Sequence, residues 1–130
     1  MSVRAIISQE DIISGDIILI DFPHVRPYFD KILGRKVFSK ERPSLVLYSK
    51  PKQMVAAYIS SRIPVPLDSA DILIEKTNPS FINTGLKDRS VIRLGVLATI
   101  PFEKVIGYIG LADNSLKAEI NTKIETNIKI

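Results

Sequence analysis

One arginine is placed where its side chain could bind an anion. Arg42 precedes Pro43 and an apolar stretch, 45–48, whose composition predicts a buried strand. Proline has no backbone N–H, so we expect Pro43 at the first position of that strand and Arg42 on the loop before it. A guanidinium held there presents a planar fork of donors that matches a phosphate and stays charged at physiological pH. The alternative is an ordinary surface arginine in front of a strand.

Positive charge is concentrated around Arg42. The 130 residues carry a net charge of +4, but residues 24–62 hold nine basic and two acidic side chains, a net +7 that leaves −3 for the rest. Lys36 and Lys40 belong to this basic segment. Such a segment attracts a polyanion, with an affinity that falls as salt is added. The alternative is a solvated loop whose lysines serve solubility.

The composition excludes several kinds of site. The chain has no cysteine and one histidine, which excludes disulfides, thiolate catalysis, cysteine metal sites and a histidine cluster. A carboxylate site for magnesium stays formally open, but no Asp/Glu pair has a suggestive spacing, so we predict neither metal nor cofactor. Apolar runs are too short to span a membrane, and residues 1–16 lack the features of a signal peptide. We therefore expect no membrane association and a cytoplasmic protein.

The elements that position these residues are predicted to be mainly strands in one domain, residues 1–130. Short strands separated by turn residues indicate a small β-barrel. The long connection 24–41 is expected to be a flexible functional loop, of which residues 35–38 could extend a neighbouring strand. The strands 43–49 and 54–60 should pair as a hairpin. The predicted strands are 16–22, 43–49, 54–60, 71–75, 90–94 and 105–109.

A single helix is predicted near the end of the chain. Asp113 can accept hydrogen bonds from the free amides of a first turn. Leu116, Ile120 and Ile124 recur at intervals of four and form one apolar face. We expect the tail after Thr122 to be frayed.

Four short motifs in this order resemble the MazF/PemK family of toxin endoribonucleases. They are GDIILIDFP at 15–23, ERPSLVLYS at 41–49, VAAYISSR at 55–62 and GLKDRSVIRL at 85–94. The resemblance covers about residues 15–123. It implies an SH3-like barrel of the MazF/PemK/CcdB type with a C-terminal helix. It also implies a homodimer that cleaves single-stranded RNA and is neutralised by a cognate antitoxin protein.

The resemblance assigns roles to individual residues. The family cuts RNA without a metal, by attack of the ribose 2′-hydroxyl on the adjacent phosphate. Arg42 matches the arginine that stabilises the negative charge of the phosphorane, and Ser60 matches the hydroxyl residue that hydrogen-bonds the scissile phosphate. Ser61 and Arg62 take the flanking, substrate-binding positions. The alternative for Ser60 is a strand-end residue that satisfies a turn.

One matching position departs from the family pattern. Arg93 matches an arginine used in acid–base work in one branch, but Gly95 stands where that branch has an aspartate. Glu41 or Asp88 could supply the missing carboxylate. Arg93 could instead pair with an acidic neighbour, and residues 87–89 are expected to be solvated turn residues.

Two other assignments remain open. His24 has a side-chain pKa near neutrality, yet it stands where the family commonly has an apolar residue, which favours a capping or packing role. The rival function is a non-catalytic barrel that binds nucleic acid or a protein such as gyrase, as the CcdB toxins do. A purely structural barrel would leave the basic segment unexplained.

Overall fold

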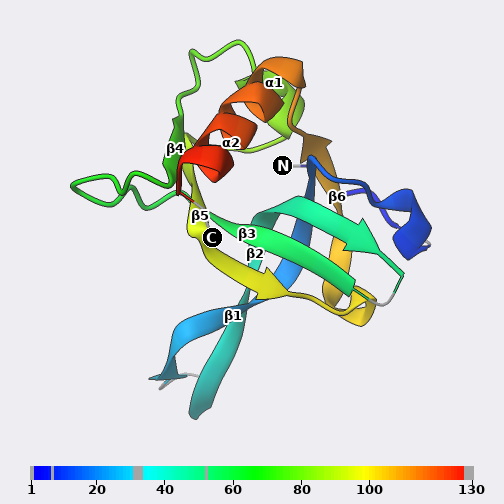
Figure 1. Ribbon diagram of the computed structural model, residues 1–130. Helices are drawn as coiled ribbons and strands as arrows, with labels where there is room; N and C mark the ends of the chain where they lie inside the picture. Colours follow the sequence, from blue (N-terminus) through cyan, green and yellow to red (C-terminus); the bar gives the residue numbers. More distant parts are fainter. Residues whose placement is uncertain (1, 7, 31–33, 52, 128–130) are drawn as a thin grey trace.

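The computed structural model describes residues 2–6, 8–30, 34–51 and 53–127, without the side chains of 23–30 and 35–40. Six strands form one antiparallel sheet in the order β4-β5-β3-β2-β1-β6 (Figure 1). The mainly-β prediction is confirmed. Within the described residues β4 and β6 are edge strands that do not pair with each other, so the sheet is open. The strands are β1 (Asp16–Asp30), β2 (Arg35–Lys50), β3 (Gln53–Ser60), β4 (Asp71–Ile74), β5 (Ser90–Thr99) and β6 (Val105–Leu111).

The predicted flexible loop at 24–41 is wrong, whereas the expectation that residues 35–38 extend a strand is confirmed, because β2 begins at Arg35. Most of this segment continues β1 and β2, which project from the sheet as a two-stranded arm (Figure 1). Tyr28 pairs with Val37, and the register shifts between Pro23 and Tyr28, a stretch that holds two prolines. Gly34 has a φ of 67°, the left-handed conformation that a tight turn needs and that glycine adopts readily. Prolines and a glycine in this segment predict a loop, whereas in the structure they mark an irregularity and a turn in a hairpin.

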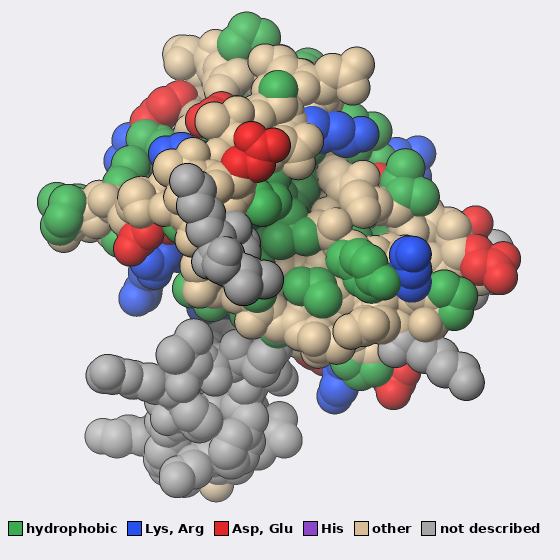
Figure 2. All heavy atoms as spheres, viewed as in Figure 1, with side chains coloured by type: hydrophobic (Ala, Val, Ile, Leu, Met, Phe, Trp, Pro, Cys, Tyr) green, Lys and Arg blue, Asp and Glu red, His purple; other side chains and the backbone are tan. Residues whose placement is uncertain are grey.

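Apolar side chains fill both faces of the sheet. Along β1, for example, Ile17 belongs to one buried cluster and Ile18 to the other, as the two-residue period of a strand requires. The first cluster is completed by Leu116 and Ile120 of the C-terminal helix α2 (Asn114–Asn127), which lies against the sheet (Figure 1). Figure 2 shows hydrophobic side chains in the hollow beneath this helix.

The remaining elements are short helices and α2. The backbone N–H of Leu116 donates to Asp113 Oδ1 at 2.9 Å, so the predicted cap is confirmed. The prediction that the tail after Thr122 is frayed is wrong as far as Asn127, because α2 continues to that residue. None of the helices in the described segments is long and apolar enough to cross a membrane. Elements that the sequence did not predict are η1 (Gln9–Asp11) and α1 (Phe81–Thr84), and η2 (Phe102–Lys104) directly precedes β6.

Candidate functional site

Arg42 lies inside β2 and not on a loop before it. The strand begins at Arg35, and Arg42 pairs with Ile20 of β1. The prediction that Pro43 opens the strand is therefore wrong. Pairing with β3 begins only at Ser44, so Pro43 and Arg42 lie just beyond the β2–β3 ladder. This is the point where β2 leaves the body of the sheet and enters the arm. Arg42 is thus half-buried and held by β1 on one side, with no β3 residue paired to it on the other.

The Arg42 guanidinium lies over an aromatic ring. Its Cζ atom is 4.7 Å from the centroid of the Tyr58 ring, within the range of a cation–π interaction. Tyr58 in turn meets Phe22 edge-on, with ring centroids 5.4 Å apart and an interplanar angle of 67°. Among the residues whose side chains are described, Arg42 makes no ion pair with a carboxylate. The ring therefore contributes to fixing the position of the guanidinium.

Ser60 ends β3 on the same face as Tyr58. The two residues are two positions apart on one strand, so their side chains point the same way. Ser60 is 6% exposed, and its Oγ accepts a hydrogen bond from the backbone N–H of Arg62 at 3.0 Å. This contact agrees with the turn-satisfying interpretation. It uses the oxygen as an acceptor and leaves the hydroxyl proton able to donate.

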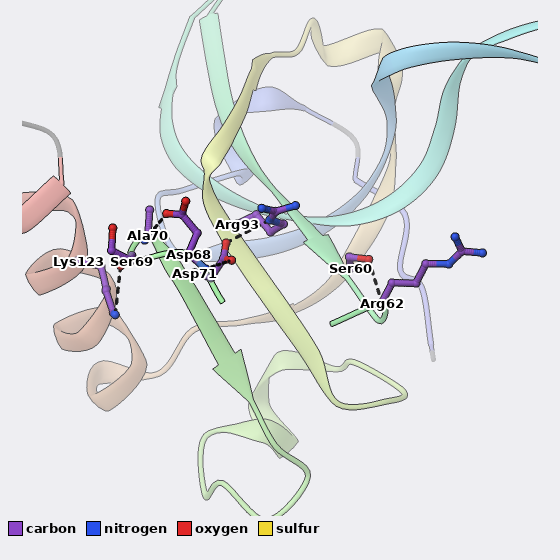
Figure 3. Close-up of polar contacts among 8 residues, drawn as sticks. All are labelled: Ser60, Arg62, Asp68, Ser69, Ala70, Asp71, Arg93 and Lys123. Carbon is purple, nitrogen blue, oxygen red and sulfur yellow. Dashed lines mark hydrogen bonds and ion pairs between the residues drawn. The ribbon is translucent and has the colours of Figure 1, made fainter. Parts of the chain in front are cut away.

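Ser61 and Arg62 diverge after the strand. Ser61 lines a pocket of about 220 Å³ together with Glu41, Arg42, Lys87 and Asp88. The Arg62 side chain is exposed and points away from the other labelled residues (Figure 3). The two carboxylates considered as replacements for the family aspartate thus line a pocket that Arg42 also contacts. Ile59 lines this pocket and alternates along β3 with Tyr58 and Ser60, so the pocket opens on the other face of the strand from the ring beneath the guanidinium. Gly95 itself is exposed, with no atom within 4 Å of where a Cβ would stand.

Arg93 is engaged by an acidic partner. Its Nε donates to Asp71 Oδ1 at 3.1 Å, and the two side chains point toward each other (Figure 3). In the sheet, Tyr58 pairs with Arg93, and Arg93 pairs with Asp71, so the three residues form one row across β3, β5 and β4. The acidic neighbour foreseen as the alternative for Arg93 is therefore present.

Lys36 and Lys40 belong to the β2 half of the arm, but their side chains, like that of His24, lie outside the described residues. No group of three or more His, Cys, Asp or Glu residues that could hold a metal occurs in the segments searched, which are the described ones. The sequence did not single out Tyr58 or Asp71. Tyr58 could have been found, because its position two residues before Ser60 on a strand predicts a shared face.

Comparisons with known proteins agree with this architecture. A solved structure of the Mycobacterium tuberculosis toxin MazF-mt6 superposes with a TM-score of 0.61 at 17% identity, covering 85% of this chain and 93% of that one. An endoribonuclease in complex with its cognate antitoxin, from a mycobacterial species, gives 0.60 at 12% identity, covering 88% and 92%. At these identities the likeness concerns the fold alone. No curated protein sequence matches the chain.

The sequence itself matches a family model. The model describes a PemK-like, MazF-like toxin of the type II toxin–antitoxin system, and it matches residues 13–128. The match includes every strand from β1 to β6 and the whole of α2. The chain therefore belongs to the PemK-like, MazF-like toxin family of type II toxin–antitoxin systems.

Proposed function

We propose that the chain is an endoribonuclease toxin that cleaves single-stranded RNA without a metal ion. The observation that supports this most directly is the placement of Arg42 and Ser60. The Arg42 guanidinium lies over Tyr58, and the Ser60 hydroxyl projects from the same strand face as that ring. A cation and a hydroxyl donor on one face can both bind a phosphodiester that crosses the end of β3.

In the proposed reaction the ribose 2′-oxygen attacks phosphorus and the bond to the 5′-oxygen breaks. The products are a cyclic phosphate and a free 5′-hydroxyl. Arg42 stabilises the extra negative charge of the phosphorane, and Ser60 donates to a phosphate oxygen. A base removes the 2′-hydroxyl proton, and an acid protonates the leaving oxygen. We assign Ser61, Arg62 and Arg93 to substrate binding or to the support of this surface.

The first experiment removes the cation. Arg42→Ala should lower cleavage of a single-stranded RNA, measured with EDTA present, by about 10² or more, because a preorganised donor to the transition state is lost. Arg42→Lys should recover only part of the rate, since an ammonium lacks the planar fork. Arg89→Ala is the matched control, because this exposed arginine pairs with Glu75 and does not itself line the pocket, although its neighbours Asp88 and Ser90 do. Equal rates for the wild type and Arg42→Ala would favour the non-catalytic binding module.

The second experiment identifies the base. Glu41 and Asp88 both line the pocket beside Arg42, and Asp88 also pairs with Lys76 at 3.7 Å. Glu41→Gln and Asp88→Asn keep the shape of each side chain and remove its charge. The variant that loses the base should be slower by about 10² to 10⁴ and should lose the rise in rate with pH on the acid side of the pH–rate profile. If neither variant slows cleavage, the base is not a carboxylate of this pocket.

We further propose that the protein acts in the cytoplasm as a homodimer and that an acidic antitoxin segment competes with RNA for the basic segment 24–62. The solved relative with its cognate antitoxin supports a partner of this kind. Lys36→Glu and Lys40→Glu should each weaken RNA and antitoxin binding together, and more strongly at low salt. Lys104→Glu reverses the charge of an exposed residue outside the segment and should change neither affinity. Unchanged binding by the two arm variants would rule out a shared surface.

A further inference from the structure

We propose that Tyr58 is a positioning residue for Arg42, a role that rests on the proposed function of Arg42 as the phosphate-binding group. The guanidinium lies 4.7 Å from the ring centroid. Two other cations lie over tyrosine rings in the described chain: Arg4 over Tyr108 at 4.9 Å and Lys50 over Tyr48 at 5.8 Å. The Arg42 contact is the shortest of the three.

The chemistry of the contact suits a residue that must bind phosphate. An arginine held by a carboxylate uses its N–H donors and its charge on that partner. The face of a phenol ring attracts the cation through its quadrupole and offers no oxygen acceptor of its own. The ring can therefore restrict the guanidinium while its donors stay available to the oxygens of a substrate. Tyr58 acts through Arg42 and does not itself touch the reacting atoms.

The ring is in turn fixed by its surroundings. Tyr58 packs against the buried cluster that contains Ile18, Ile20 and Val46, and its edge meets Phe22. Its backbone pairs with Ser44 of β2 and with Arg93 of β5, so it lies in the middle of the sheet. An aromatic side chain has two side-chain torsions, and both are restricted here by packing. The flexible arginine side chain thus lies on a rigid surface, which lowers the conformational entropy lost when substrate binds.

The position of Arg42 explains why such a support is needed. Pairing between β2 and β3 begins at Ser44, so the backbone of Arg42 has no β3 partner. The side chain reaches β3 through its contact with the Tyr58 ring. Without the ring, the guanidinium would sample several rotamers at the base of the arm. The expected loss in cleavage rate is about tenfold, which corresponds to the upper part of the usual range for a cation–π contact.

The test compares Tyr58→Phe, Tyr58→Leu and Tyr58→Met in two measurements. In cleavage assays, Tyr58→Phe should retain the wild-type kcat, whereas Tyr58→Leu and Tyr58→Met should lower kcat about tenfold. In an Arg42→Ala background the same substitutions should have no further effect, because the group that they position is absent. Tyr108→Leu is the matched control: this tyrosine also lies under an arginine and packs against the same cluster, at the other side of β1.

The second measurement does not depend on activity. The Arg42 Nε–H resonance should show an upfield ring-current shift in the wild type and in Tyr58→Phe, and should lose it in Tyr58→Leu or Tyr58→Met. If the protein proves not to cleave RNA, this spectrum still decides whether the ring holds the arginine. An Arg42 resonance at its ordinary shift in the wild type would overturn the proposal, even if Tyr58→Leu failed to fold. Equal rate losses from Tyr58→Leu with and without Arg42 would also overturn it.

Discussion

Arg93 Nε donates to Asp71 Oδ1 at 3.1 Å, and this ion pair joins a side chain that is 35% exposed to one that is only 2% exposed. The second carboxylate oxygen of Asp71 accepts the backbone N–H of Asp68 at 2.8 Å. Asp71 thereby connects β5 to the segment that leads from β3 to β4. On the other side of that segment, Lys123 Nζ and Asn127 Nδ2 of α2 both donate to the carbonyl of Ser69 at 3.2 Å. The connection that follows Ser60 is thus held from two sides (Figure 3).

Removal of Arg93 should destabilise the fold. Arg93→Ala leaves the Asp71 carboxylate buried without a counter-ion, and we expect a loss of about 2–3 kcal/mol, below the range for fully buried pairs because Arg93 is partly exposed. The matched control is Arg89→Ala, which breaks an ion pair with Glu75 of the same 3.1 Å length between two exposed side chains. That variant should lose less than about 1 kcal/mol. Urea denaturation of the three proteins measures both values.

Cleavage and stability measurements together separate a structural role of Arg93 from a role in RNA binding. If Arg93 supports the surface and does not bind RNA, Asp71→Asn should impair cleavage in proportion to its effect on stability, and Arg93→Lys should recover part of both. Equal stability losses for Arg93→Ala and Arg89→Ala would contradict the structural role. In that case Arg93 would be better placed among the substrate-binding residues.

Much of the sheet and part of the site could be predicted from local signals. The apolar runs at 16–22 and 54–60 predicted strands because their side chains fill a core, and Asp113 predicted the start of α2 through its spacing to the apolar face. The arm was missed because its prolines and Gly34 carry the same signal in a loop and in an irregular hairpin. The Asp71–Arg93 pair joins residues 22 positions apart, and nothing in either local sequence specifies their register.

Acid should weaken the cap of α2. The Leu116 backbone N–H and, next, the Ser80 hydroxyl donate to the Asp113 carboxylate and lower its pKa below the ordinary 3.8. Because the folded pKa is the lower one, this contribution to stability is complete above pH 3.8 and is lost as the pH falls through the folded value. Asp113→Asn should flatten that acid-side fall, as followed by thermal unfolding at several pH values. If the stability of this variant falls with decreasing pH as steeply as that of the wild type, groups other than Asp113 cause the fall.

Ionisation of Asp16 should lower the stability of the fold, which is the opposite of the effect of Asp113. Burial raises its pKa above 3.8, while the Ile13 backbone N–H and the charge of Lys117 partly oppose the shift. The folded state therefore holds the proton more tightly, and stability should decrease as the pH rises from 3.8 through the raised folded pKa. Asp16→Asn keeps an acceptor for Ile13 and should remove this decrease. Lys117→Met should enlarge it, because an opposing charge is lost. A fall of the same size in all three proteins would exclude Asp16 as its origin.

Two glycines with nearly the same backbone conformation should differ sharply in their tolerance of alanine. Gly85 has a φ of +70° and Gly34 a φ of +67°, both in the left-handed region. A Cβ at Gly34 would meet nothing within 4 Å, whereas at Gly85 it would run into the backbone carbonyl of Ile109 and stand 2.7 Å from the Cγ2 of that residue. Gly34→Ala should therefore cost only the conformational strain, about 1 kcal/mol.

Gly85→Ala should cost about 2–4 kcal/mol, because overpacking against a backbone atom of β6 adds to the same strain. It should also lower cleavage more than its stability loss explains, since Leu86, Lys87 and Asp88 follow directly and line the pocket beside Arg42. Urea denaturation and RNA cleavage, measured under conditions where each variant is fully folded, separate the two effects. Equal stability losses for the two alanine variants would mean that β6 moves away from Gly85 at little cost, and the contact between α1 and β6 would then have no part in placing the pocket.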